Sequence, residues 1–291
     1  MVASLLKLLI LMILCAHCAA PGGISKTSWT PDLTQRIPSR PRQALTGSQF
    51  AAYVAEMEPK QREQAIRGQL LGGNLPAFLR ELVPVQLEHP LPTGKFVHAT
   101  IFVMPDYLAI GSNDDFLRIP MNLRTAAAVA SQFGFVLPTT KMVDAIYEQS
   151  AYHFEPEPMV PGPEMRSTEY YRIHNQKIKE QGLILGASRG KLVSGHKKDV
   201  VVTNLLAGEP GKIAIYGWHR SRGHPIQPLS TVHGARYADY SHGVRLVSDM
   251  VLMDGQFVSI YEILQDPLLA DTLSDEGVVS NLGQMIGLWA A

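Results

Sequence analysis

Apolar side chains recur every three or four positions in several stretches of the chain, a spacing typical of helices with one buried face. Phe50, Val54 and Met57 predict a first helix from Ser48. A second is expected to begin at Pro59, which suits a first helical turn, and to end at the glycine pair 72–73. Further helices are expected over 74–82, 122–133, 139–152, 167–181 and 257–274.

Runs of β-branched and aromatic residues predict short strands between these helices. The longest run is KFVHATIFVM, at 95–104, and a loop rich in proline and histidine is expected over 221–235. The other predicted strands are 107–110, 116–121, 135–137, 192–193, 200–203, 212–217 and 244–253. Because the strands do not alternate regularly with helices, the pattern favours an α+β fold, with a helical N-terminal part packed on a mostly antiparallel sheet.

The first twenty residues have the order of a secretory signal peptide, with Lys7 before an apolar run and small residues after it. The run is shorter than the roughly 20 residues that span a bilayer, which disfavours a membrane anchor. Cys15 and Cys18 both lie in this segment. The mature chain would therefore have no disulfide, thiolate metal site or cysteine nucleophile.

Prolines mark the expected domain organisation. Four prolines among polar residues predict a flexible linker over 21–45, and residues 46–291 are expected to form a single α+β domain. Four more prolines make 155–165 a candidate internal boundary.

The composition excludes several classes of protein. Lys plus Arg and Asp plus Glu both number 26, and 46% of residues are hydrophobic, so the chain is neither disordered nor basic enough for electrostatic binding of nucleic acid. We expect a secreted or periplasmic protein with no stable membrane span after signal removal, and no nucleic-acid partner.

Histidines concentrate in the last third of the chain, where His196, His219, His224, His233 and His242 fall among glycine-bearing loops and strand ends. Histidine is the usual general base near neutral pH and a common ligand of zinc, so a divalent metal is a candidate cofactor. The residues predicted to be catalytic are His196, Lys198, Asp199, His219, His233, Ser241, His242 and Arg245. Asp199 and Asp239 are candidates to orient a histidine, and Lys198 or Arg245 would hold an anionic group or stabilise an oxyanion.

Three aromatic residues, Trp218, Tyr237 and Tyr240, lie in the same stretch and are candidate substrate-binding residues. Ser241 is a candidate nucleophile, although on a strand its side chain would point away from that of the adjacent His242. A base for Ser241 would then be another histidine.

Residues 241–245 read SHGVR and resemble the SHGCxR motif of L,D-transpeptidases, which remodel peptidoglycan. IYGWH at 215–219 is similar to a histidine-bearing strand of that family. The resemblance implies that His224 or His219 is the base-side histidine and that Ser241, His242, Gly243 and Arg245 line a pocket. The family's cysteine is missing, which implies lost or altered chemistry.

From about Leu71 the chain also resembles a group of uncharacterised secreted bacterial proteins, through segments such as GGNLPAFLREL and SGHKKDVVV. That resemblance implies secretion and one continuous unit.

Two functions follow from these patterns. The first is a secreted hydrolase or transferase that acts on a cell-envelope or extracellular polymer such as peptidoglycan through a histidine-centred site. The alternative is a non-catalytic exported protein that binds glycan or peptide through the aromatic residues, or that is purely structural.

Overall fold

Residues 32–280 and 282–285 are described by a computed structural model of the chain. The expected signal peptide, both cysteines and the first part of the expected linker lie outside these residues. The second part of that linker is packed: Ile37 is buried in the core, and Arg40 donates to the Asn74 Oδ1 and Gly111 carbonyl oxygens. The buried Ile37 side chain and the Arg40 guanidinium, which donates to two acceptors, hold residues 33–45 against the domain. The prediction of a flexible linker is therefore wrong for these residues.

The helices begin and end where the sequence supplies caps. The first, α1 (Gly47–Tyr53), has a capping box between Thr46 and Gln49. The second, α2 (Pro59–Leu71), has the predicted bounds, and α3 (Leu123–Phe133) runs from its Asn122 cap to a left-handed Gly134. The remaining helical segments are η1 (Ala77–Arg80), α4 (Thr140–Glu148), η2 (Pro163–Arg166), α5 (Thr168–Ile184), α6 (Leu205–Gly208), α7 (Ile260–Gln265), η3 (Ala270–Thr272) and α8 (Leu282–Met285).

The larger sheet joins distant parts of the chain. Its strands are β1 (Val83–Pro90), β2 (Phe96–Val103), β5 (Phe135–Val136), β12 (Val247–Ser248), β13 (Met250–Met253) and β14 (Gln256–Ser259). Their order is β14-β13-β2-β12-β5, and β1 forms an antiparallel hairpin with β2. The single strand predicted over 244–253 is therefore divided, and the sequence pattern missed β1.

The second sheet carries most of the predicted site residues. Its strands are β8 (Lys198–Val201), β9 (Ala214–Ser221), β10 (His224–Ser230) and β11 (His242–Gly243), in the order β10-β9-β8-β11. The loop predicted over 221–235 is thus partly an edge strand. Two smaller pairs complete the set: β3 (Ala109–Gly111) with β4 (Phe116–Arg118), and β6 (Tyr152–His153) with β7 (Val193–Ser194).

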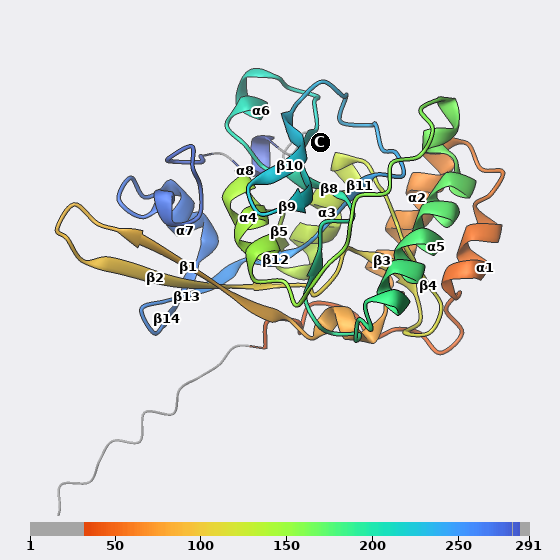
Figure 1. Cartoon of the computed structure of the whole chain (residues 1–291), viewed down its shortest axis with the longest axis horizontal. Coiled ribbons are helices and arrows are strands. Elements are labelled where there is room, and N and C mark those ends of the chain that lie inside the picture. Colours follow the sequence, from red (N-terminus) through yellow and green to blue (C-terminus); the bar gives the residue numbers. More distant parts are fainter. Residues whose placement is uncertain (1–31, 281, 286–291) are drawn as a thin grey trace, which may run out of the picture. The chain divides into compact units, whose positions relative to one another are not determined.

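The fold is α+β, as predicted, and only the β8–β11 and β6–β7 pairs are parallel among the ladders of the described residues. The helices α1, α2 and α5 gather at the end of the domain opposite the β1–β2 hairpin (Figure 1). α1 packs against β3 and β4, and α2 packs against α3. No helix within the described ranges is both long and apolar enough to cross a membrane.

From Leu33 onward the described residues form one unit, so the chain is continuous through the proline-rich stretch at 155–165.

Candidate functional site

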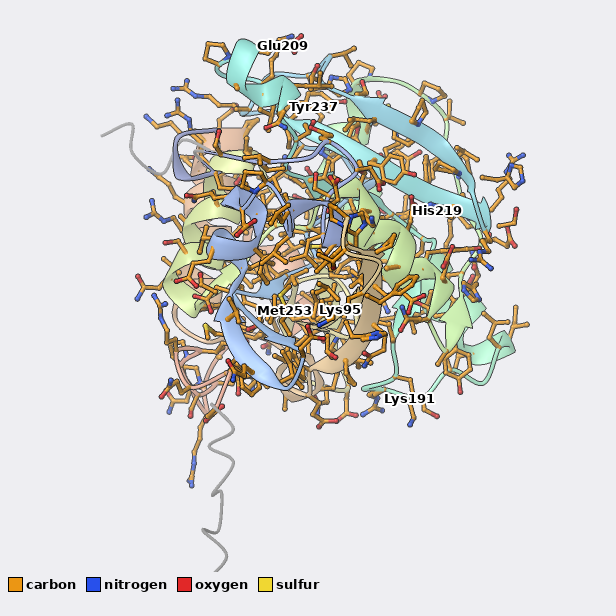
Figure 2. All side chains as sticks on the ribbon, turned by 90° about the vertical axis from the view of Figure 1, so that its left-hand side faces the viewer. Lys95, Lys191, Glu209, His219, Tyr237 and Met253 are labelled. Atoms are coloured by element: carbon orange, nitrogen blue, oxygen red, sulfur yellow. The ribbon has the colours of Figure 1, made fainter. Side chains whose placement is uncertain are left out.

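The clustered histidines separate into groups rather than meeting at one point. His196 pairs with Asp106, and His219 pairs with Asp144. His233 and His242 lie near each other, with ring centroids 6.2 Å apart. His224 is exposed on β10. Figure 2 shows His219 well apart from Tyr237, which belongs with the third group.

Asp239 is the centre of that third group. Its Oδ1 accepts hydrogen bonds from the Ser241 hydroxyl at 2.6 Å and the Ser241 N–H at 2.8 Å, and its Oδ2 accepts one from the Tyr237 hydroxyl at 3.0 Å. Burial alone would raise the pKa of Asp239, but His242 and the Ser241 donors outweigh burial and lower it. Asp239 is therefore a buried carboxylate held by its own loop.

The geometry does not activate Ser241 as a nucleophile. Its hydroxyl donates to Asp239, whereas an activated serine donates to a base such as an imidazole. Nε2 of His242 lies 3.9 Å from Asp239 Oδ2, and neither ring nitrogen of His242 has a hydrogen-bond partner among the described residues. His233 and Tyr237 stack at 4.0 Å, are half-buried, and contact the fully buried His242.

The second group surrounds His219 on β9. Its Nε2 lies 2.9 Å from Asp144 Oδ1, and the Tyr216 hydroxyl donates to the same carboxylate at 3.0 Å. Tyr147 stacks on the imidazole at 4.6 Å. Asp144, on α4, was not predicted, because it lies 75 positions from His219 in the sequence. This is the histidine–carboxylate pairing that the sequence pattern anticipated, with a different acid.

Asp199 orients no histidine. It lies buried on β8 and accepts a 2.7 Å hydrogen bond from the Tyr107 hydroxyl. Burial raises the pKa of Asp199 to about 6, although Arg245 opposes the shift. Arg245 is itself fully buried: it donates to the carbonyl oxygens of Met104 and Val193 and lies 4.4 Å from the centroid of the Tyr107 ring. It therefore joins two segments of the fold and cannot hold a substrate anion.

The first group lies beneath α5. Arg118 forms a bidentate ion pair with Asp106, and His196 Nε2 is 3.1 Å from the same carboxylate. Burial would raise the pKa of Asp106, but Arg118 and His196 hold it well below its usual range. Burial lowers the pKa of His196 to about 4, so the imidazole is neutral at pH 7. This group was missed because Asp106 follows β2 and Arg118 ends β4, and Asp106 lies 90 positions from His196 in the sequence.

The aromatic candidates are not an exposed platform. Trp218 and Tyr240 are 5% and 2% exposed, and Tyr237 alone of the three reaches solvent in part. Trp218 has a left-handed backbone with φ of 56°, and its ring contacts Lys198, whose Nζ lies 5.1 Å from the ring centroid. Lys198 is thus half-buried on an aromatic face rather than poised over a substrate.

The described residues contain no group of three His, Cys, Asp or Glu side chains placed to hold a metal ion. The divalent metal that the sequence allowed for therefore has no set of protein ligands in that part of the chain.

A cavity of about 570 Å³ adjoins the Asp239 group. Among the described residues that line it, one is acidic, Glu63, and six are basic: Lys60, Arg62, Arg67, Arg124, Arg166 and Arg236. We call it the arginine-lined cavity. The guanidinium of Arg166 lies 5.3 Å from the Tyr237 ring centroid, and the Tyr171 hydroxyl donates to the Ala238 carbonyl oxygen, so residues 236–238 separate the cavity from Asp239.

Few of these basic groups are neutralised. Glu63 accepts from the Asn122 N–H and the Thr125 hydroxyl, and Arg62 donates to the Arg166 carbonyl oxygen and the Thr168 hydroxyl. Within the described part of the chain, no ion pair or side-chain hydrogen bond involves Lys60, Arg67, Arg124 or Arg236. The N-terminal turns of α2 and α3 also line the cavity and add partial positive charge.

Comparisons of the chain with family models, with curated proteins and with solved structures give no match. The resemblance of SHGVR to the L,D-transpeptidase motif therefore stays a prediction. Val244 follows Gly243, where that motif has its cysteine, and is fully buried, and its carbonyl oxygen accepts from the Leu108 N–H.

Sequence reasoning missed the arginine-lined cavity. Its basic residues come from α2, α3, the turn before α5 and the loop after β10, and each alone is an ordinary surface residue. The net charge of the sequence does not reveal them, because the chain as a whole is neutral.

Proposed function

We propose that the chain is an exported binding protein, and that the arginine-lined cavity holds an anionic group of a cell-envelope or extracellular polymer. The observation that carries the proposal is the gathering of six basic side chains and one acidic side chain around a cavity of about 570 Å³. Export is supported by the order of residues 1–20, the predicted signal peptide.

The physical argument is electrostatic. Like charges that share a concave, partly desolvated surface repel one another, and the field they create attracts counter-ions. Arginine forks match the oxygens of phosphate and carboxylate groups, and such charge-assisted hydrogen bonds are among the stronger polar contacts. Lys60, Arg67, Arg124 and Arg236 have donors to spare for such a ligand.

Calorimetric titration tests the proposal, with poly(glycerol phosphate) and polygalacturonate as phosphate-bearing and carboxylate-bearing probes. The Arg124→Gln/Arg236→Gln double variant should bind the preferred polymer about tenfold more weakly or worse, since each 1.4 kcal/mol lost is a tenfold change. The matched control is Arg42→Gln/Arg220→Gln, which removes two exposed arginines outside the cavity lining.

Equal loss in both double variants would mean non-specific attraction, and no binding of either polymer would refute the proposal. The affinity for the preferred polymer should also fall with added salt, because ion pairs with an exposed anion are screened.

Acid–base catalysis at the Asp239 group is a second candidate function. The observation that favours it is Tyr237, whose ring meets Arg166 of the cavity lining and whose hydroxyl donates to Asp239. A hydrolase or transferase would release fragments from the bound polymer, and His242→Gln and Asp239→Asn would stop that release while leaving binding intact. A binding protein would release no fragments, which chromatography of the incubated polymer would show.

A further inference from the structure

A second cavity, of about 280 Å³, lies beside the C-terminal half of α5. Three aromatic side chains, Phe78, Phe116 and Phe154, line it together with Ile178 and Leu183, and charged side chains line the rest. We call it the phenylalanine cavity. Figure 2 shows Lys191, which lines it, far from Tyr237, whose ring contacts Arg166 of the arginine-lined cavity.

The apolar lining continues onto the surface. Leu183 is 82% exposed and the adjacent Ile184 is 84% exposed. Isolated apolar residues on a surface are ordinary, but Leu183 lines the aromatic cavity and so continues its apolar lining onto the surface. The fold does not bury the Leu183 side chain, and a ligand with an apolar body would cover it.

Of the described charged side chains that line the phenylalanine cavity, four are basic and two, Asp106 and Asp114, are acidic. Arg189 is paired with Asp114 at 2.9 Å, and Arg118 is paired with Asp106 at the floor. Lys191 and Lys179 also line the cavity, and neither has a carboxylate within ion-pair distance among the described residues.

The Nζ of Lys179 lies 5.4 Å from the centroid of the Phe116 ring. Burial lowers the pKa of Lys179, and Asp115 opposes the shift. The Lys179 ammonium group therefore lies over the Phe116 ring. A ligand bound there would contact the aromatic wall with its apolar body and the ammonium group with its anionic end.

We infer that the phenylalanine cavity binds a small amphipathic anion, a molecule with an apolar body and one carboxylate. The body would lie between the phenylalanine rings, and the carboxylate would lie at Lys179 and Lys191. The volume of about 280 Å³ is at the small end of ligand cavities and fits a medium-chain carboxylate rather than a polymer. This site is independent of the proposed polymer binding.

Gly182 provides a sharp test, because it lies in α5 and lines the cavity. A Cβ at Gly182 would meet Phe154 Cζ at 3.5 Å and Ala187 Cβ at 4.0 Å, which are ordinary contacts. Gly182→Leu would thus place a side chain in the cavity without backbone strain. Replacing a helical glycine also favours the helix, so the variant should fold.

The probe is octanoate, titrated calorimetrically into wild-type protein and Gly182→Leu. We expect saturable binding to the wild type and at least a tenfold weaker affinity in the variant. The matched control is Gly68→Leu in α2, where an added Cβ meets nothing within 4 Å, and its affinity should equal that of the wild type.

A second comparison tests the charge. Octylamine should bind the wild type at least tenfold more weakly than octanoate, and Lys179→Gln/Lys191→Gln should abolish this preference. If Gly182→Leu fails to fold, the comparison of octanoate with octylamine in this double variant tests the proposal by itself. Absence of octanoate binding, or equal affinity in Gly182→Leu and the wild type, overturns the proposal.

A further outcome would also overturn the proposal. If the wild type dimerises, Gly182→Leu does not, and octanoate does not bind, then the phenylalanine cavity is covered by a second copy of the chain. Octanoate binding should be unchanged in Arg124→Gln/Arg236→Gln, which separates this site from the proposed function.

Discussion

His174 on α5 should make the protein sensitive to acid, and replacing it should remove part of that sensitivity. The side chain is fully buried, with its ring centroid 5.0 Å from that of Tyr240. Neither ring nitrogen has a hydrogen-bond partner among the described residues. Burial lowers the pKa of His174 well below its ordinary value, and Lys197 adds to the shift. The folded protein therefore keeps this imidazole neutral.

The size of the effect follows from proton linkage. Below pH 6.5 the unfolded chain binds a proton at His174 that the folded chain does not bind, so the free energy of unfolding falls as the pH falls. The slope is about 1.4 kcal/mol per pH unit, which gives about 2.7 kcal/mol between pH 6.5 and 4.5. This contribution is fully present above pH 6.5 and is lost on acidification.

The perturbation is His174→Phe, which keeps an aromatic ring and removes the titrating group. We expect the free energy of unfolding at pH 7 to change by about 1 kcal/mol or less, because the variant removes the desolvation cost of an unpaired imidazole while the larger ring strains the packing. At pH 4.5 the variant should gain about 2–3 kcal/mol relative to the wild type, which is about 5–10 °C in the melting temperature for a chain of this size.

Urea unfolding followed by tryptophan fluorescence at pH 7 and 4.5 measures the difference directly. Other buried histidines titrate equally in both proteins and cancel. The control is His98→Phe, which replaces a histidine that is exposed on β2 rather than buried. Parallel pH profiles for His174→Phe and the wild type would show that the folded protein can protonate His174, and the reasoning would fail.

Three further predictions concern the last third of the chain. Val244→Cys should fold, but its thiol should react with a thiol reagent only on unfolding, because Val244 is fully buried; rapid labelling of the native variant would contradict this. Arg245→Met should cost about 3–5 kcal/mol in urea unfolding, since it leaves two buried carbonyl oxygens unpaired and Asp199 without its opposite charge. Gly195→Ala should cost about 2 kcal/mol or more in melting experiments, because Gly195 has φ of +93° and an added Cβ would meet the Phe154 carbonyl oxygen; an unchanged melting temperature would refute it.

The sequence predicted elements well where local signals decide them. Pro59 and the glycine pair after Leu71 bound α2 as expected, and Asn122 caps α3. β10 was missed because Pro225 and Pro228 read as loop residues, although prolines are tolerated on an edge strand, which β10 is.

The candidate site was predicted less well, because its geometry depends on tertiary pairing. Histidines from the same stretch of the sequence pair with different carboxylates: His196 pairs with Asp106, and His219 pairs with Asp144. His233, Tyr237 and His242 lie close together because they share one loop and the strand after it. A count of histidines locates titratable residues but does not say which carboxylate each one meets.

The strand order of the larger sheet has a consequence for the timing of folding. Thr100 of β2 pairs with Leu252 of β13, and Val103 pairs with Val247 of β12, both more than a hundred positions later. During synthesis β2 leaves the ribosome long before these partners exist, and such distant pairing is slow to form. A chain threaded through a membrane pore, as the proposed export requires, would stay unfolded until its last quarter arrived. The topology that closes the sheet would thus also suit the proposed export, because it delays folding until the last strands are made.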